Sequence, residues 1–425
     1  MGHNPPLRIF LSALTVLLPL SGVILRSQTA PDAAYSSIDA HALAAPRSAE
    51  TSFKTLAEWL TAPCRSDEEK ARVIFRWITE NIRYDVDAYF AGDPLSGDAA
   101  DALRNKTGVC EGYAGLFGEL AKASGIEAAR ITGYAKGYGY VPGQPPGMVP
   151  NHAWNAVRIG GRWRLIDCTW GAGYIGDDRT FHRAFDPHYF LTSPAEFIFD
   201  HFPENEVWQL LDSPRSRADF ERTVHVKSGF YNLGLSLGTN SEGTLRSDGE
   251  IVVRLGLTRP VTGIAALLKR ERPSDDRCTF VQNERNSLVV RVTPPDTGLY
   301  SLRLFARAAA DAGPYGWILD YRIDSRRKES RVQAYPRKFS QFDKGNARIL
   351  EPIAGVLPAG TVQTFRIVIP AGDQAAVIVN ESWTFLKQAG DEWRGDVTVQ
   401  PGTISLCTKQ PGSDEWETLL EYKGE

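Results

Sequence analysis

Cysteine is scarce in this sequence of 425 residues: there are five, and they form neither a CxxC pair nor a spacing typical of a zinc site. This scarcity excludes a small protein held together by a disulfide framework. If the chain is exported, an odd number of cysteines leaves at least one thiol unpaired within the monomer, as a reactive cysteine requires. A bridge between Cys64 and Cys168 stays open, and Cys278 and Cys407 are expected to be buried small side chains or partners in a structural bridge.

Long basic runs are also absent. The 48 Lys and Arg residues are nearly balanced by 51 Asp and Glu residues, which gives a formal net charge of -3. No basic stretch is long enough to follow a phosphate backbone, so nucleic acid is not an expected partner. Apolar residues at 42% and charged residues at 23% are typical of globular proteins, and most of the chain should therefore fold.

Metal and phosphate motifs are missing as well. His182, His188 and His201, taken with Asp186, have no helical HxxxH or other recognised ligand spacing, which favours structural hydrogen bonding over a metal site. The Gly- and Pro-rich stretch 137–150 lacks the GxGxxG pattern and the strand-to-helix context of a phosphate loop, and we expect it to lie over a cleft. Neither a metal nor an organic cofactor is predicted.

The amino terminus holds a long uncharged run. Ile9–Leu25 contains 17 uncharged, mostly apolar residues after Arg8, which favours export. The run is long for a signal-peptide core and short for a membrane span, and no good cleavage site follows it, so a cleaved signal peptide, an uncleaved anchor and a buried helix all stay open. Residues 1–30 are therefore set apart, and we expect a periplasmic, extracellular or membrane-anchored protein that contacts a membrane only through this segment if it is uncleaved.

Length and pattern predict several domains. Residues 31–50 are rich in Ala, Ser, Asp and Pro and are expected to form a mobile linker. From Phe53 onward apolar residues recur every three or four positions, and Ser66 opens a capped helix. Beyond about Ser213, short alternating segments separated by turns indicate β-sandwiches. The predicted order is an α+β core over residues 51–213, a first β-sandwich over 214–327 and a second over 328–425.

Cys110 is expected at the start of a helix with one buried face. The residues that follow it form an i, i+3, i+4, i+7 pattern: Tyr113, Leu116, Phe117, Leu120 and Ala121. A cysteine acts as a nucleophile in its thiolate form, which a helix N-terminus and a nearby imidazolium both favour. The backbone N–H groups of the first turn could also hold a developing oxyanion.

A hairpin is predicted to bring His152 close to Asp167. Gly160 and Gly161 lie between two alternating runs, which is a strong signal for a two-residue turn. If Ile159 pairs with Arg162, the register makes His152 and Asp167 diagonal neighbours on one face, about 7–8 Å apart at the backbone. A carboxylate at that distance can accept a hydrogen bond from the imidazole. The same alternation places the Cys168 side chain on the opposite face.

Three stretches closely resemble the blocks of the transglutaminase-like superfamily, which has a papain-like fold. They are Thr107–Phe117 (TGVCEGYAGLF), Asn151–Val157 (NHAWNAV) and Leu165–Gly171 (LIDCTWG). The segments Tyr189–Pro194 and His201–Leu211 resemble the region after the core in kyphoscoliosis-peptidase-like proteins, which often carry β domains behind it. The resemblance covers roughly residues 55–211 and implies a papain- or transglutaminase-like cysteine-protease core followed by two immunoglobulin-like sandwiches.

The resemblance also implies roles for individual residues. Cys110 would be the nucleophile, His152 the base and then the acid, and Asp167 the group that orients the histidine. One departure is Cys168, which follows the aspartate where proline is more common, and this bears on the local turn. Substrate-binding candidates flank the site: Trp154 and Trp170 either line an acyl-substrate groove or pack in the core, and Tyr84 is expected near the thiol.

Two functions of different classes follow. The first is an exported acyl-transfer enzyme that acts on peptide or protein amides through a Cys110 thioester; water as acceptor makes it a peptidase or amidase, and an amine makes it a transglutaminase. The second is a catalytically silent scaffold whose β domains bind a cell-envelope or other protein partner. Retention of all three residues favours the enzyme.

Overall fold

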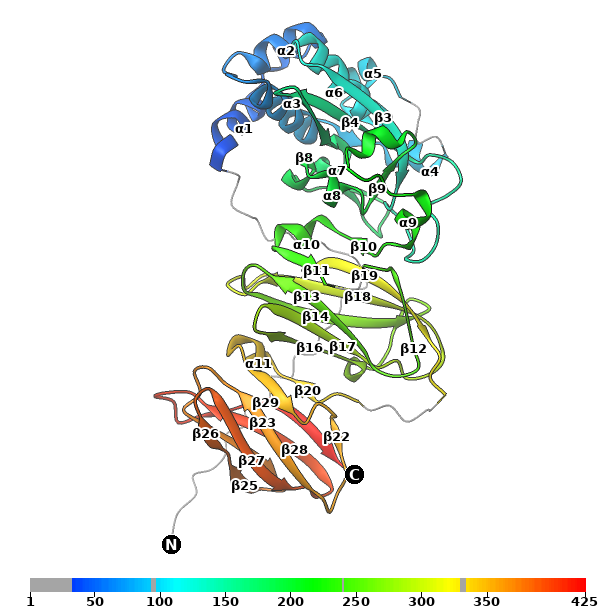
Figure 1. Ribbon diagram of the computed structural model, residues 1–425. Coiled ribbons are helices and arrows are strands. Elements are labelled where there is room, and N and C mark those ends of the chain that lie inside the picture. The colour runs from blue at the N-terminus through cyan, green and yellow to red at the C-terminus, as the bar shows by residue number, and fades with distance from the viewer. Residues whose placement is uncertain (1–32, 93–96, 239–240, 329–333) are drawn as a thin grey trace. The chain divides into compact units, whose positions relative to one another are not determined.

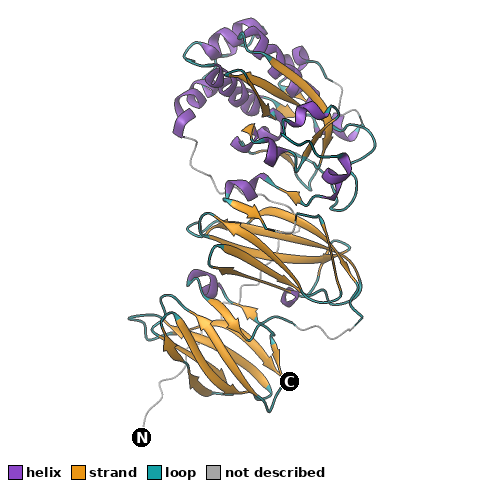
Figure 2. Ribbon diagram, in the orientation of Figure 1, coloured by secondary structure: helices purple, strands orange, loops and turns teal. Residues whose placement is uncertain are grey.

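The computed structural model describes residues 33–92, 97–238, 241–328 and 334–425, which form two compact units that divide between Asn232 and Leu233. The predicted leader, residues 1–30, lies outside the described residues, so cleavage, anchoring and export stay predictions. Within the described ranges, the helices are all too short or too polar to cross a membrane. The domain boundaries expected after residues 213 and 327 also stay predictions. Figure 2 shows that helices dominate the first unit and strands the second.

The first unit packs helices against a five-stranded sheet. The sheet order is β8-β5-β4-β3-β9, and α6 packs on β3 and β4 (Figure 1). Its strands are β3 (Ala128–Ala135), β4 (His152–Ile159), β5 (Arg162–Ile166), β8 (Phe190–Thr192) and β9 (His201–Pro203). Its longer helices are α1 (Ser36–Leu43), α2 (Phe53–Thr61), α3 (Asp67–Asn81) and α6 (Cys110–Ala123).

Shorter elements complete this unit. The pairs β1 (Arg83–Tyr84) with β2 (Thr107–Gly108) and β6 (Gly173–Ile175) with β7 (Phe181–Arg183) form two small sheets. The short helices are α4 (Val86–Phe90), α5 (Ala99–Asn105), α7 (Cys168–Ala172), α8 (Pro194–Phe197), α9 (Arg217–Arg222) and α10 (Ser228–Asn232).

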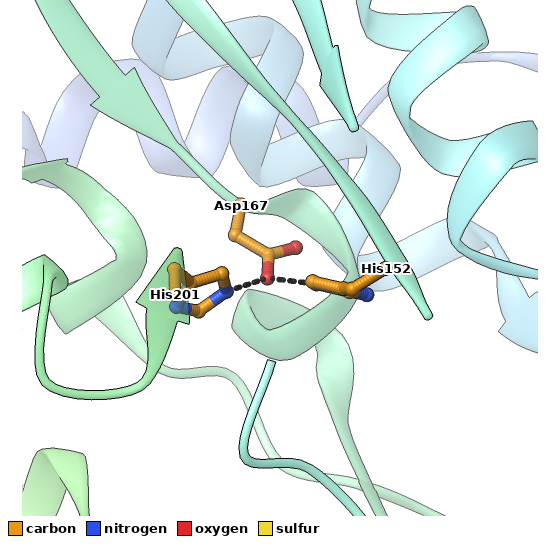
Figure 3. A group of neighbouring side chains, drawn as sticks. All are labelled: His152, Asp167 and His201. Carbon is orange, nitrogen blue, oxygen red and sulfur yellow. Dashed lines mark hydrogen bonds and ion pairs between the residues drawn. The ribbon is translucent and has the colours of Figure 1, made fainter. Parts of the chain in front are cut away.

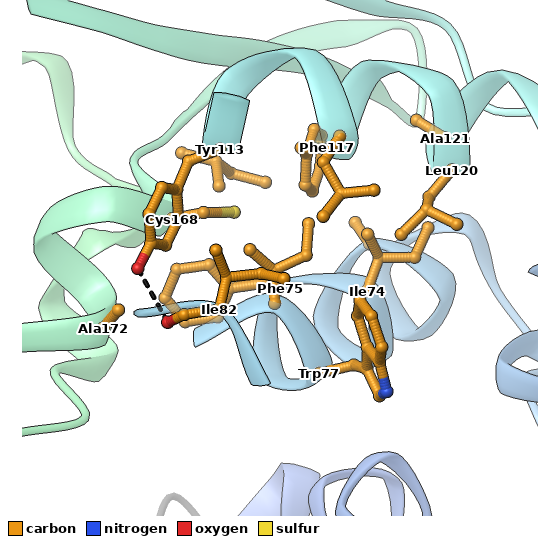
Figure 4. Packing of buried hydrophobic residues seen from close by; sticks show 14 of the residues in the cluster. Ile74, Phe75, Trp77, Ile82, Tyr113, Phe117, Leu120, Ala121, Cys168 and Ala172 are labelled. Carbon is orange, nitrogen blue, oxygen red and sulfur yellow. Dashed lines mark hydrogen bonds between the residues drawn. The ribbon is translucent and has the colours of Figure 1, made fainter. Parts of the chain in front are cut away.

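The predicted helix signals are confirmed. The Ser66 side chain caps α3 by accepting a hydrogen bond from the Glu69 N–H, 3.2 Å away. Apolar side chains of α3 and α6 meet in one core, in which Phe75 and Phe117 lie close to Tyr113 (Figure 4). This packing fixes the start of α6 relative to the sheet.

The region expected to be a linker is helical instead. Within residues 31–50, α1 buries Ile38, and Asp39 forms a two-pronged ion pair with the buried Arg72 of α3, both N–O distances being 2.7 Å. The Tyr35 hydroxyl also hydrogen-bonds Glu68. The prediction of a mobile linker is therefore wrong over this stretch, because a partner far along the chain stabilises a helix that has no strong apolar period of its own.

The hairpin register is confirmed from Ile159–Arg162 to Asn155–Ile166. Gly160 and Gly161 adopt φ values of 57° and 78°, which a two-residue turn of this kind requires. The alternation expected as far as Cys168 is wrong at its end, since the ladder stops at Ile166 and Asp167 caps α7. Capping ends the strand because the carboxylate accepts hydrogen bonds from backbone N–H groups of the first helical turn.

The second unit is built from β-sheets that are mostly antiparallel, consistent with the predicted all-β regions. The first pair of sheets has the orders β11-β13-β17-β16 and β19-β18-β14-β15, with β12 parallel to β19. Their bounds are β11 (Leu235–Leu237), β12 (Thr244–Ser247), β13 (Ile251–Leu257), β14 (Val261–Lys269), β15 (Arg272–Pro273), β16 (Thr279–Glu284), β17 (Ser287–Val292), β18 (Gly298–Ala308) and β19 (Gly316–Ser325).

The second pair of sheets has the orders β21-β23-β27-β26 and β20-β29-β28-β24-β25, with β22 parallel to β29. The bounds are β20 (Arg337–Lys338), α11 (Ser340–Lys344), β21 (Arg348–Glu351), β22 (Val356–Leu357), β23 (Val362–Val368), β24 (Gln374–Val379), β25 (Ser382–Phe385), β26 (Lys387–Ala389), β27 (Glu392–Thr398), β28 (Gly402–Lys409) and β29 (Trp416–Gly424). An α+β core followed by all-β sheets is the fold class expected from the sequence.

All five cysteines are free thiols, so the bridge left open between Cys64 and Cys168 is not formed. Cys168 lies in the apolar core of the first unit beside Tyr113 and Phe75 (Figure 4). Cys278 and Cys407 are buried as well, in the second unit. These thiols pack as small apolar side chains.

Candidate functional site

Cys110 is the first residue of α6, as expected from the sequence. The preceding Val109 is extended, and its apolar side chain cannot cap the helix, so the first-turn N–H groups are not bound by a side chain at the cap position. The thiol is buried, with Ala114 and Ala153 as apolar neighbours. Cys110 therefore lies where the helix presents partial positive charge.

His152 opens β4 and hydrogen-bonds Asp167 through Nε2, 2.8 Å from Oδ2. Burial alone would lower the pKa of His152, but the charge of Asp167 and this hydrogen bond, with further contributions from a hydrogen bond and the charge of Cys110, raise it to about 9. The imidazole thus lies beside both the carboxylate and the thiol side chain. Because Nε2 faces Asp167, Nδ1 is the nitrogen left for the sulfur.

Asp167 holds its place through both carboxylate oxygens. Oδ1 accepts hydrogen bonds from the backbone N–H groups of Thr169 and Trp170, at 2.7 and 3.1 Å. Oδ2 accepts from two imidazoles, those of His152 and His201 (Figure 3). Burial alone would raise the pKa of Asp167, yet the charge of His152 and the hydrogen bonds from both rings hold it well below its usual range.

His201 is the residue that the sequence analysis did not assign to this site. It begins β9, is fully buried, and places Nε2 3.0 Å from Asp167 Oδ2 and Nδ1 2.6 Å from Asp200 Oδ1. The expectation of structural hydrogen bonding is confirmed, but the partner was not foreseen. The available signal was that His201 opens a segment resembling kyphoscoliosis-peptidase-like proteins.

The two tryptophans surround the imidazoles. The Trp154 ring centroid lies 5.9 Å from that of His152, and the Trp170 centroid lies 5.3 Å from it. Trp154 is only 1% exposed and therefore packs within the core, whereas Trp170 is partly exposed. Their roles toward a substrate stay predictions.

Tyr84 lies near the thiol, as expected. Burial and then the charge of Cys110 raise the pKa of Tyr84 above its ordinary value, and Cys110 also contributes to the raised pKa of Tyr89. Tyr89 is in turn in edge-to-face contact with Tyr138 of the loop between β3 and β4, at 6.2 Å between centroids. Aromatic side chains therefore lie between this loop and Cys110.

The ring nitrogens of His152 and His201 and an oxygen of Asp167 lie within 4.8 Å of one another. Hydrogen bonds from both rings to the same carboxylate oxygen account for this spacing. The arrangement is thus that of a charged hydrogen-bonded array, and the absence of a metal stays a prediction from the sequence.

Comparison with protein-family models agrees with the fold. Residues 54–168 match the family model of the transglutaminase-like superfamily, and residues 217–336 match that of the KY-like, immunoglobulin-like domain. A solved structure of a TGase aligns with 34% of this chain and 35% of its own, with 17% sequence identity and a TM-score of 0.21.

Two curated relatives match a larger share of the chain than either family model does. Kyphoscoliosis peptidase of Mus musculus is 33% identical over 276 residues, which are 64% of this chain and 41% of that protein. Hillarin of Drosophila melanogaster is 30% identical over 302 residues, 64% of this chain and 37% of that protein. The chain spans about two fifths of the length of these relatives. Residues 54–168 therefore belong to the transglutaminase-like superfamily, and their combination with a KY-like, immunoglobulin-like domain matches the kyphoscoliosis-peptidase-like subgroup.

Proposed function

We propose that the first unit is a cysteine-dependent acyl-transfer enzyme acting on peptide or protein amides. Cys110 is the nucleophile, His152 the general base and then acid, and Asp167 the residue that orients the imidazole. The observation that supports this most is the position of His152, which hydrogen-bonds Asp167 at 2.8 Å and interacts with the Cys110 side chain.

Each step then follows from the side chains present. The Cys110 thiolate attacks the amide carbonyl carbon, and the resulting oxyanion is held by N–H groups of the first turn of α6. The His152 imidazolium donates its proton to the leaving amine as the C–N bond breaks, which leaves a thioester on Cys110. Water or a second amine then attacks the thioester, with His152 accepting its proton, and the thiolate is regenerated.

The choice of acceptor decides between hydrolysis and cross-linking. A glutamine-containing peptide, supplied with and without an added primary amine, separates the two outcomes by mass. Ammonia release with a gain of water at the glutamine indicates an amidase, incorporation of the amine indicates a transglutaminase, and cleavage of the chain indicates a peptidase. Cys110→Ala is expected to abolish each reaction, whereas Cys168→Ala, the matched buried thiol in the same unit, should retain turnover.

Thiol labelling across pH tests the nucleophile without knowledge of the substrate. Burial raises the pKa of Cys64, Cys278 and Cys407 to about 11 each and that of Cys168 well above its ordinary value. Iodoacetamide at pH 6 should therefore modify Cys110 first, and His152→Ala should remove this preference. A Cys110 rate that rises tenfold per pH unit up to about 8.5, like an ordinary thiol, would favour the silent scaffold.

The scaffold remains the second candidate because relatives are matched over less than half of their length. In that function the β sheets of the second unit bind a protein partner, of the cell envelope if the chain is exported. Binding of a partner that is unchanged by Cys110→Ala, together with no cysteine-dependent turnover, would support it.

A further inference from the structure

We propose that His201 is a positioning residue of this site, which holds the Asp167 carboxylate in place so that His152 keeps its orientation toward Cys110. The inference rests on the proposed function for its catalytic meaning. Its physical basis is that the imidazoles of His152 and His201 hydrogen-bond the same oxygen of Asp167, so that a change in one ring affects the other (Figure 3).

The hydrogen bonds of His201 define a chain of charged groups. Its Nε2 lies 3.0 Å from Asp167 Oδ2, and its Nδ1 lies 2.6 Å from Asp200 Oδ1. Both ring nitrogens face carboxylates, so both are donors when the ring carries two protons. The Tyr189 hydroxyl donates to the second oxygen of Asp200 at 3.3 Å, which extends the chain further from Cys110.

Packing leaves the His201 ring little freedom to turn. The ring stacks on Phe197 with centroids 4.0 Å apart and lies 4.4 Å from the Trp170 ring and 5.1 Å from that of Trp154. The strand that carries it, β9, pairs with β3, where Ala135 faces His201. A side chain held this firmly can fix the carboxylate that it contacts.

The charges around His201 give it an electrostatic effect on His152. The groups that face it are Asp167, Asp200 and the His152 ring, 5.3 Å away between centroids, with the Tyr189 hydroxyl behind Asp200. Lys136 lies on the Asp200 side, and burial lowers its pKa to about 7, so it carries its full charge only below that pH. The charges of Asp200 and Asp167 and their hydrogen bonds outweigh burial and raise the pKa of His201 to about 9. A cation here opposes the pull of Asp167 on the His152 proton, and its loss should let His152 hold that proton to higher pH.

Asp200→Asn removes the positive charge of His201 while keeping its ring in position. The asparagine amide can still hydrogen-bond Nδ1, so a neutral His201 keeps its Nε2–H directed at Asp167, but the cation is lost at neutral pH. We expect the His152 titration, followed by NMR on histidine-labelled protein, to move up by about one pH unit. His201→Gln should move it in the same direction and should also lower kcat at least tenfold with little change in KM, because the residue does not touch substrate.

Phe197→Leu is the matched control, since it loosens the packing on His201 without changing any charge. It should lower thermal stability and leave the His152 titration within about 0.3 units. The inference is overturned if Asp200→Asn and His201→Gln leave that titration unchanged, or if the shift in Phe197→Leu equals theirs. If His201→Gln fails to fold, the His152 titration of Asp200→Asn alone tests the inference.

The NMR titration does not depend on turnover, so this inference and the proposed function fail separately. A chain without cysteine-dependent activity whose His152 titration still shifts would retain the coupling and lose the enzyme. A chain with activity and no shift would retain the enzyme and lose the role of His201.

Discussion

At the scale of single residues, Asp167 combines a structural role with its proposed chemical role. One carboxylate oxygen caps α7, and the other accepts hydrogen bonds from two imidazoles. Asp167→Asn should keep the cap, because asparagine caps helices about as well as aspartate. The amide would, however, present an N–H to His152 Nε2 and favour the wrong tautomer.

We therefore expect Asp167→Asn to reduce kcat about 100-fold or more. The loss of unfolding free energy should be much smaller than the increase in activation free energy that this drop in kcat represents. Steady-state kinetics and thermal unfolding on the same preparation measure the two effects. Asp98→Asn, at the exposed cap of α5, is the control and should retain full activity. Equal activity of the two variants would remove Asp167 from the proposed mechanism.

Gly133 is a second residue whose small size is required. It lies between His152 of β4 and Pro203 of β9 in the sheet. A Cβ at this position would lie 2.5 Å from the Trp154 ring and would collide with the Phe202 carbonyl oxygen. Adding a methyl group should therefore displace both the strand that carries His201 and the ring beneath it.

Gly133→Ala should cost about 1–3 kcal/mol of unfolding free energy and lower activity in parallel. Gly118→Ala, in the middle of α6 with open space around the new Cβ, should instead stabilise the protein by up to about 1 kcal/mol. Urea unfolding of both variants measures the contrast. A Gly133→Ala variant as stable as the wild type would show that β9 can move away at no cost.

At the scale of elements, α1 depends on a buried ion pair. Arg72 is 1% exposed, and its guanidinium also lies 4.7 Å from the Tyr35 ring centroid. Removing Asp39 leaves this cation buried without its partner, so Asp39→Ala should destabilise the first unit by about 3–5 kcal/mol. The double variant with Arg72→Met should recover part of that loss.

The control for the buried Asp39–Arg72 ion pair is the exposed ion pair Lys54–Glu58, whose side chains are 81% and 62% exposed. Glu58→Ala should change stability by no more than about 0.5 kcal/mol. Denaturant unfolding monitored in the first unit distinguishes the two sites. Similar small effects at both would mean that α1 is held by apolar contacts alone.

Elements with local signals were predictable, and those with distant partners were not. Gly160 and Gly161 determine a two-residue turn, and the hairpin register follows from it. His201 contacts Asp167 only because β9 pairs with β3, and the two residues are 34 positions apart. No periodicity reports a contact of this kind. The helix in residues 31–50 escaped prediction for the same reason, since its stabilising partner is Arg72.

At the scale of the whole molecule, the two units should respond differently to pH. The pKa of His152 and of His201 is raised to about 9 in the fold, against about 6.5 in an unfolded chain. Their contribution to stability is therefore complete below about pH 6.5 and is lost as pH rises toward 9, by up to about 1.4 kcal/mol per pH unit for each histidine. Asp167, whose pKa is depressed, contributes above about pH 4 and loses its contribution below that.

Residues 233–425 contain no histidine. Calorimetry should accordingly resolve a transition of the first unit that falls in temperature between pH 6.5 and 9 and a transition of the second unit that stays nearly constant. In His201→Gln, the transition temperature of the first unit should fall less between pH 6.5 and 9. Two transitions that move together with pH would contradict the assignment of this dependence to the histidine and aspartate array.

The position of β9 has a consequence for where the functional unit ends. The region that matches the transglutaminase-like family model stops at residue 168, and it includes Cys110, His152 and Asp167. A gene fragment trimmed to that boundary would encode every residue of the proposed triad and discard His201 and Asp200, which extend the hydrogen-bond chain from Asp167. It would also lose Thr223, whose backbone and hydroxyl oxygens bind the buried ammonium group of Lys136. The smallest piece worth expressing for activity therefore runs past the family boundary, at least to Thr223 at the end of α9.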